Sequence, residues 1–139
     1  MTLEKFRIRH SYLIEQYQFV EHHLEGIYAS ACNSGFFKGL EEVGKSNLNK
    51  LVREIRRIEN EKRIQIISEE LYAKIEKIIE RRNFWCHNCY VDMLFKSNGD
   101  PKKEEDIKTL NADIAEAEKL KDVLFELKQQ FLEKIKPYI

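Results

Sequence analysis

The sequence has few helix-breaking residues and no excess of charge of either sign. It contains five glycines and two prolines in 139 residues, too few for the many tight turns of a β-sandwich or barrel. Lysine plus arginine and aspartate plus glutamate both number 24, so the formal net charge is zero. This balance excludes a strongly basic nucleic-acid binder of the histone type. No apolar run reaches the roughly 18 residues that a membrane span requires.

Cysteine is also scarce, and the first residues are charged. Three cysteines make an odd number, and residues 1–7 (MTLEKFR) lack the apolar stretch of a signal peptide. Reduced thiols in the cytoplasm are the simplest interpretation. Hydrophobic residues reach 42% and charged residues 35%, which suits a packed core with charged helix faces. The length predicts a single domain over residues 1–139.

Apolar residues recur at helical spacing along most of the chain. The pattern predicts a first helix over about residues 2–35, a loose segment over residues 36–45 and a second helix with Ser46 as its N-cap. A third helix runs from its cap at Ser68 to about Phe95, and a fourth follows the turn at residues 98–101 and ends at Pro137. Residues 64–67 fit either an extended link or a frayed helix end. Four helices with one apolar stripe each predict an all-α fold, an antiparallel four-helix bundle of up-down topology.

Charge is segregated between two of these helices. Residues 50–63 hold six basic and three acidic side chains, whereas residues 104–126 hold eight acidic side chains and three lysines. One interpretation is two solvated faces that pack as neighbours. The other is that the basic helix lines a groove for phosphates.

The third helix carries the most informative stretch, ERRNFWCHNCY at residues 80–90. Its apolar stripe continues into Arg82, where an aliphatic side chain is expected. A buried guanidinium without a partner is very costly, so Arg82 must be paired or must face a cavity or an interface. Arg82 and His87 are five residues apart and point about 140° apart on a straight helix. We therefore expect either a distorted helix or partners from elsewhere, such as a second subunit.

Residues 82–87 (RNFWCH) resemble the signature of the HEPN superfamily, an arginine followed after four to six residues by a histidine, often with a polar residue after the arginine. The resemblance implies a bundle of four to five helices and a homodimer whose paired motifs form one RNA-cleaving cleft, without a metal or cofactor. It also implies a toxin–antitoxin or phage-defence role, with an antitoxin protein as a further partner. Arg82 and His87 would be catalytic and Asn83 would be an accessory polar residue.

The charge pattern adds a candidate RNA-binding set. Its members are arginines of the basic helix and of the motif: Arg53, Arg56, Arg57 and Arg81. In one HEPN subgroup a tyrosine two places after the histidine is modified by a nucleotidyltransferase antitoxin. That place is Cys89 here and the tyrosine is Tyr90, which argues against this form of regulation.

The chemistry of the motif is physically reasonable for RNA cleavage. An imidazole with a reference pKa near 6.5 can exchange the 2′-hydroxyl proton at the pH of the cell. A guanidinium matches two phosphate oxygens and keeps its charge when it is desolvated. The expected products are a 2′,3′-cyclic phosphate and a 5′-hydroxyl.

Two other interpretations remain open at this point. The bundle could be a non-catalytic adaptor or assembly module, with the region of Arg82 as a structural dimer interface. It could instead hold zinc through the CxxC motif, using candidate ligands from two helices: Cys86 and Cys89 with Cys32, His22 and His23. The simpler expectation for the CxxC motif is a pair of reduced cysteines on partly buried helix faces.

Overall fold

The structure is a computed structural model that describes residues 2–44, 46–89 and 104–138, and every regular element in this part of the chain is helical. The all-α prediction is therefore confirmed. None of the helices that the structure describes has a stretch long and apolar enough to cross a bilayer. The elements in chain order are α1 (Leu3–Ala31), α2 (Phe36–Val43), α3 (Leu48–Lys62), α4 (Glu69–Asn83), the π-helical turn η1 (Phe84–Asn88), α5 (Glu104–Ile135) and the 3₁₀ turn η3 (Lys136–Tyr138).

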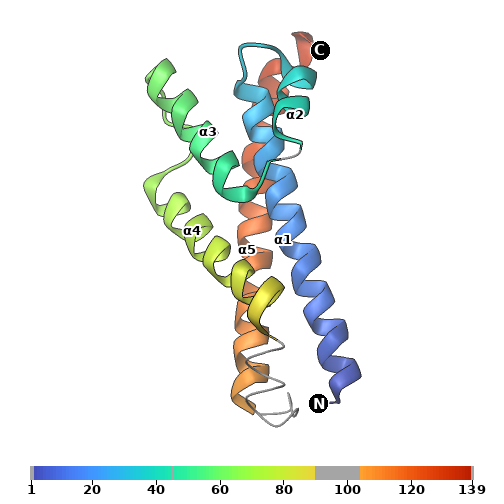
Figure 1. The fold of residues 1–139 in the computed structure, drawn as a ribbon. Coiled ribbons are helices and arrows are strands. Elements are labelled where there is room, and N and C mark those ends of the chain that lie inside the picture. The colour runs from blue at the N-terminus through green and yellow to red at the C-terminus, as the bar shows by residue number, and fades with distance from the viewer. Residues whose placement is uncertain (1, 45, 90–103, 139) are drawn as a thin grey trace.

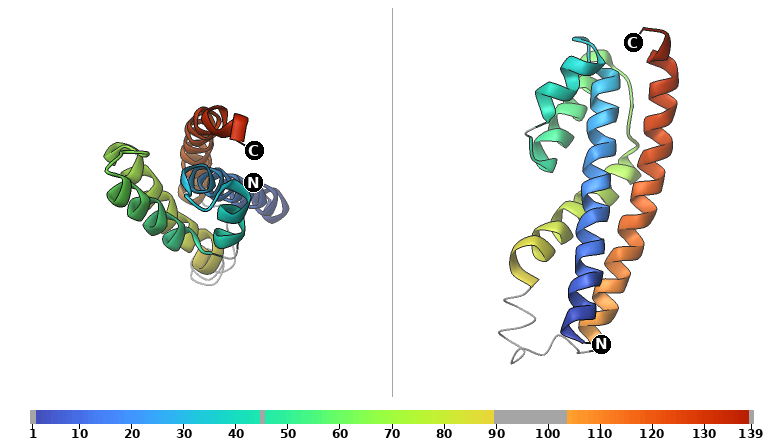
Figure 2. Two further views of the ribbon diagram at one scale, coloured as in Figure 1. Left: turned by 90° about the horizontal axis from the view of Figure 1, so that it is seen from above. Right: turned by 90° about the vertical axis from the view of Figure 1, so that its right-hand side faces the viewer.

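Helices α1 and α5 are the two long rods of the molecule, and they lie side by side along their length (Figures 1 and 2). They run in the same direction. Arg9 near the start of α1 donates to Asn111 near the start of α5, with 3.0 Å between Nη2 and Oδ1. Further along both helices, His23 lies 3.0 Å from Lys128. The shorter helices α3 and α4 form an antiparallel pair on one side of these rods.

The parallel course of α1 and α5 differs from the expected up-down order of four helices. The reason is α2, which occupies the segment predicted to be loose, so that this part of the prediction was wrong. Gly39 lies against α1, where an added Cβ would stand 3.0 Å from the backbone of Ala29. This short helix runs antiparallel to α1, so α3, which follows it, runs in the same general direction as α1 (Figure 1). The sequence hid α2 because its apolar pattern covers only two turns, contains Gly39 and is flanked by Gly35 and Gly44.

The predicted apolar stripes form one hydrophobic core. Burying such side chains is the main favourable term in folding, at about 1.5–3 kcal/mol for each large one. On α1 the stripe residues all have at most 8% of their surface exposed, and the stripe of α3 is buried in the same way. On α5 the stripe is buried from Leu110 to Leu124, whereas Leu127, Phe131 and Ile135 are partly buried. Members with no exposed surface come from four helices and η1: Leu13, Val20, Leu24, Ile27, Ile55, Ile75, Trp85, Leu110, Ala117 and Leu124.

The helix ends follow capping rules, with one shift from the prediction. Ser68 caps α4 as expected, its hydroxyl accepting from the Leu71 amide at 3.1 Å. The cap of α3 is Asn47 rather than Ser46, because the Asn47 side chain accepts from the Lys50 amide at 2.8 Å. Gly35 has a φ of 98° and precedes α2 instead of directly ending α1. The predicted turn at residues 98–101 lies outside the described residues.

The link between α3 and α4 is extended and is fastened by one carboxylate. Helix α3 ends where Arg63 adopts the left-handed conformation, with a φ of 52°. The Glu59 carboxylate then accepts from the backbone N–H groups of Ile66 and Ile67, at 2.8 and 2.9 Å, and from the Tyr72 hydroxyl. Residues 64–67 are thus an extended link. The side chains of Ile66 and Ile67 are buried, and their backbone N–H groups have the Glu59 carboxylate as hydrogen-bond acceptor.

Candidate active site

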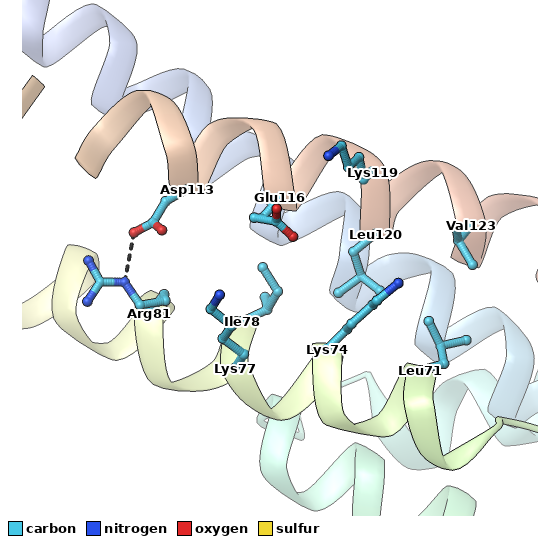
Figure 3. A pocket seen from close by; sticks show the side chains of 10 residues that line it. All are labelled: Leu71, Lys74, Lys77, Ile78, Arg81, Asp113, Glu116, Lys119, Leu120 and Val123. Carbon is cyan, nitrogen blue, oxygen red and sulfur yellow. Dashed lines mark hydrogen bonds and ion pairs between the residues drawn. The ribbon is translucent and has the colours of Figure 1, made fainter. Parts of the chain in front are cut away.

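The motif lies where α4 ends against the first half of α1. Helix α4 runs antiparallel to α1: Arg82 at the end of α4 contacts Glu21, and Trp85 in η1, further along the chain, contacts His10. Helix α5, which lies beside α1, also packs on α4 and contributes Asp113 to the same region (Figure 3). The site is therefore positioned by three helices that are far apart in the sequence.

A π-helical turn, η1, lies inside the motif. The Cys89 N–H donates to the Phe84 carbonyl, five residues back, where an α-helix would use the carbonyl four residues back. The Trp85 carbonyl instead accepts from His10 Nε2 at 2.8 Å and from the Cys89 thiol at 3.1 Å. A carbonyl oxygen only accepts, so His10 carries its proton on Nε2. The helix is therefore distorted inside the motif, which is one of the two alternatives that the spacing of Arg82 and His87 predicted.

A second cluster fixes η1 to α5. Trp85 is fully buried, and its indole N–H donates to Asp113 Oδ2 at 2.6 Å. The same oxygen accepts from Arg81 Nε at 2.7 Å (Figure 3). The Arg81 guanidinium also lies over the Phe84 ring, 4.8 Å from its centre. Arg81, one of the candidate RNA-binding residues, is thus engaged in holding the turn in place.

Arg82 is half-buried and has a partner within the chain. Its Nη2 lies 3.3 Å from Glu21 Oε2, with 31% of the arginine side chain exposed and 20% of the glutamate. The partner is on α1 rather than on the helix that carries Arg82. Arg82 also lines an open hollow with Gln18, Glu21, His22 and Glu25. Both conditions set by its place on the stripe, a partner and a cavity, are met.

The hollow beside Arg82 is locally acidic. Burial raises the pKa of Glu25, and the negative charge of Glu21 raises it further. A phosphate that approached Arg82 here would have to displace the Glu21 carboxylate from the guanidinium. Glu21 therefore competes with any anionic ligand for this arginine.

His87 and Asn83 lie on the surface of the same helix end. Both are exposed, and within residues 2–44, 46–89 and 104–138 neither forms a hydrogen bond. The structure thus places Arg82 and Asn83 in the last turn of α4 and His87 in η1, with Arg82 in contact with α1 and the side chains of the other two exposed.

The other candidate RNA-binding arginines lie on α3. Arg56 stacks on the Tyr72 ring at 3.7 Å and lies 3.4 Å from Glu69 and 3.5 Å from Glu76 of α4. Arg57 pairs with two acids of its own helix, which raise its pKa. Arg53 is exposed and has no ion pair among the described residues. The carboxylates that pair with the arginines of α3 therefore come from α3 and α4. None of these pairs involves α5, the acidic helix that was predicted to pack beside the basic one.

The zinc hypothesis receives no geometric support in the described part of the chain. Cys86 is exposed, Cys89 is buried against the Trp85 carbonyl, and Cys32 lies at the other end of α1 beside Glu42. Residues 2–44, 46–89 and 104–138 hold no group of three or more histidine, cysteine, aspartate or glutamate side chains placed to bind a metal ion.

Three residues of this region were not found from the sequence: Glu21, His10 and Asp113. Each contacts the motif from another helix. His10 is 75 residues from Trp85 in the sequence, and Asp113 is 28 residues from it. Glu21 and Asp113 resemble ordinary surface acids in the sequence, and His10 has no distinctive spacing. No local signal marks them. Their roles depend on the packing of α1 and α5 against α4.

Comparison with known proteins identifies no relative of this chain. Neither the protein-family models nor the curated proteins and solved structures that were searched contain a match to this chain. The functional argument therefore depends on the motif and its geometry.

Proposed function

We propose that this protein is a HEPN-like, metal-independent endoribonuclease of a toxin–antitoxin or phage-defence system, with its active site at a homodimer interface. The observation that carries the proposal is the π turn inside the motif. Single π turns inside α-helices are rare and are frequently found at functional sites. Here the turn begins two residues after Arg82 and contains His87.

In this proposal each residue has a separate task. The exposed imidazole of His87 takes the proton from the 2′-hydroxyl, whose oxygen attacks the neighbouring phosphorus. Arg82 leaves Glu21 and stabilises the charge on the phosphorane. Asn83 orients the phosphate or the hydroxyl by hydrogen bonding. The P–O5′ bond breaks, the 5′-oxygen receives a proton, and a 2′,3′-cyclic phosphate remains.

The homodimer supplies what a single chain lacks. In one protomer His87 is exposed without a hydrogen-bonding partner among the described residues, and Arg82 opens to a shallow hollow. A two-fold copy that packed on this helix end would enclose a cleft and bring two sets of these groups together. Size-exclusion chromatography with light scattering tests this directly, and a stable monomer at micromolar concentration contradicts the composite site.

The activity test uses RNA in the presence of EDTA, with the same oligonucleotide carrying 2′-O-methyl groups as the unreactive control substrate. His87→Ala is expected to lower the cleavage rate at least about 100-fold, the usual contribution of a general base. Cys86→Ala is the matched control, because Cys86 is an exposed neighbour in the same turn. Equal rates in the wild type and the His87 variant would remove the motif from the mechanism.

Arg82 needs a control that separates catalysis from structure. Arg82→Ala breaks the pair with Glu21 and removes the guanidinium, whereas Glu21→Gln breaks the pair and keeps the guanidinium. We expect the first variant to lose activity and the second to bind RNA more tightly, because Glu21 no longer competes for Arg82. If both variants lose activity to the same degree, the ion pair itself is what matters.

The second candidate is a non-catalytic adaptor with a structural interface at this helix end. The observation in its favour is the Arg82–Glu21 pair, since an arginine that is already paired within its own chain is also a common structural feature. A folded dimer that cleaves no RNA, and whose dimerisation weakens on Arg82→Ala, would favour the adaptor.

A further inference from the structure

A narrow crevice lies between α4 and α5. It begins beside Arg81 and Asp113 and extends to Leu71 and Val123, away from the motif (Figure 3). Its volume is about 70 Å³. Four apolar side chains, two from each helix, form its floor: Leu71 and Ile78 of α4 and Leu120 and Val123 of α5. Val123 is 48% exposed, so its side chain is accessible to a ligand in the crevice.

The rim of the crevice is basic. Lys74 and Lys77 of α4 and Lys119 of α5 line it. Lys74 has only a distant carboxylate, 3.8 Å away in Glu70, and Lys77 and Lys119 have none within ion-pair distance among the described residues. Arg81 is neutralised by Asp113, which leaves three ammonium groups facing one remaining carboxylate, that of Glu116.

An apolar floor beneath unpaired cations selects for a particular class of ligand. The hydrocarbon part of the ligand replaces water over the leucine, isoleucine and valine side chains. The anionic part meets the ammonium groups of Lys77 and Lys119, which form no ion pair among the described residues, and that of Lys74, whose only carboxylate is 3.8 Å away. A cation with the same tail would be repelled by the rim, and a small anion without a tail would gain little from the floor.

The length of the crevice sets the size of the ligand. Residues 71–81 of α4 and 113–123 of α5 border it, and ten residues of helix span about 15 Å, which corresponds to an extended hydrocarbon chain of about ten carbons. The crevice is too small for a lipid with two chains. We propose that the crevice between α4 and α5 binds a single-chain amphiphilic anion, a medium-chain carboxylate, independently of the nuclease function.

The test measures binding of decanoate to the full chain by isothermal titration calorimetry, below its micellar concentration. We expect a dissociation constant on the order of 0.1 mM with one site per chain. Butyrate and decyltrimethylammonium are the comparison ligands, which lack the tail and reverse the charge, respectively. Both are expected to bind at least about tenfold more weakly. Equal binding of decyltrimethylammonium and decanoate would overturn the proposal, as would no detectable decanoate binding.

Matched variants place the ligand in the crevice. Val123→Glu puts a carboxylate on the floor and is expected to weaken decanoate binding at least about tenfold. Phe125→Glu is the control, because Phe125 is comparably exposed, at 40%, on the same helix but outside the crevice. Replacing both Lys77 and Lys119 by serine is expected to weaken decanoate binding about fivefold. Equal losses in the Val123 and Phe125 variants would show non-specific adsorption and reject the site.

Discussion

Asp113 is expected to be the main fastening of the candidate active site to the bundle, and Asp113→Leu tests this. The substitution keeps an apolar side chain of similar size and removes both hydrogen bonds of the carboxylate. Trp85 is fully buried, so its indole N–H loses its acceptor at a cost of about 1–3 kcal/mol. The half-buried bond to Arg81 adds about 1 kcal/mol, since that side chain is 29% exposed and can reach water. We expect a loss of about 3 kcal/mol in the free energy of unfolding.

The assay is urea unfolding, followed both by circular dichroism and by fluorescence. Trp85 is the only tryptophan of the chain, so its emission reports on this site alone. A loss of about 3 kcal/mol lowers the melting temperature by roughly 10 °C in a domain of this size. A double-mutant cycle with Trp85→Phe isolates the indole bond and should give a coupling of about 1–2 kcal/mol, because the second variant has no N–H to leave unpaired.

Glu116→Leu is the control for this experiment. Glu116 is exposed on α5 three residues further along and forms no ion pair within the described residues, so its loss should change stability by less than about 0.5 kcal/mol. A destabilisation of less than 1 kcal/mol in Asp113→Leu, or a cycle without coupling, would refute the assignment of Asp113 as the fastening residue.

Three further predictions concern stability elsewhere in the bundle. Burial and the charge of Lys128 lower the pKa of His23 to about 4. Between pH 6.5 and pH 4, His23 is therefore protonated in the unfolded chain but not in the folded chain. The free energy of unfolding should fall by about 3 kcal/mol over this range, and it should fall less steeply in His23→Phe. Glu59→Ala removes the acceptor of two backbone N–H groups and of the Tyr72 hydroxyl, and should cost about 3 kcal/mol in urea unfolding. Gly39→Ala adds a Cβ at 3.0 Å from the backbone of α1, and should lower thermal stability by about 1–2 kcal/mol despite the better helix propensity of alanine.

Each of these predictions has a matched control. His22→Phe replaces an exposed histidine and should leave the acid limb of the stability curve unchanged. Glu61→Ala removes an exposed carboxylate whose partner is on the surface and should have a small effect. Gly26→Ala adds a Cβ that meets only the flexible Lys128 side chain, so its effect should be close to zero. An effect in any control as large as in its partner variant would contradict the corresponding contact.

The sequence by itself determined the elements and the faces that they bury. Helical periodicity needs only local information, and the stripes of α1, α3, α4 and α5 were placed correctly because each large aliphatic residue is buried wherever the helix packs. Ser68 as a helix cap was also a local property. The demand that Arg82 be paired or face a cavity followed from the cost of burying a lone charge, and it held.

The tertiary structure alone decided the direction of the helices and the surroundings of the motif. Helix α2 has only eight residues, one of them Gly39, so its apolar pattern is too short to distinguish a helix from a loop, and it is this helix that turns the chain so that α1 and α5 run in parallel. Glu21 and Asp113 meet the motif from two other helices, and no local pattern distinguishes them from the many exposed acids of this chain. Hydrophobic burial is non-directional and fixes which face of a helix is inside, but which polar residues meet across the packed faces depends on long-range geometry that a local pattern does not contain.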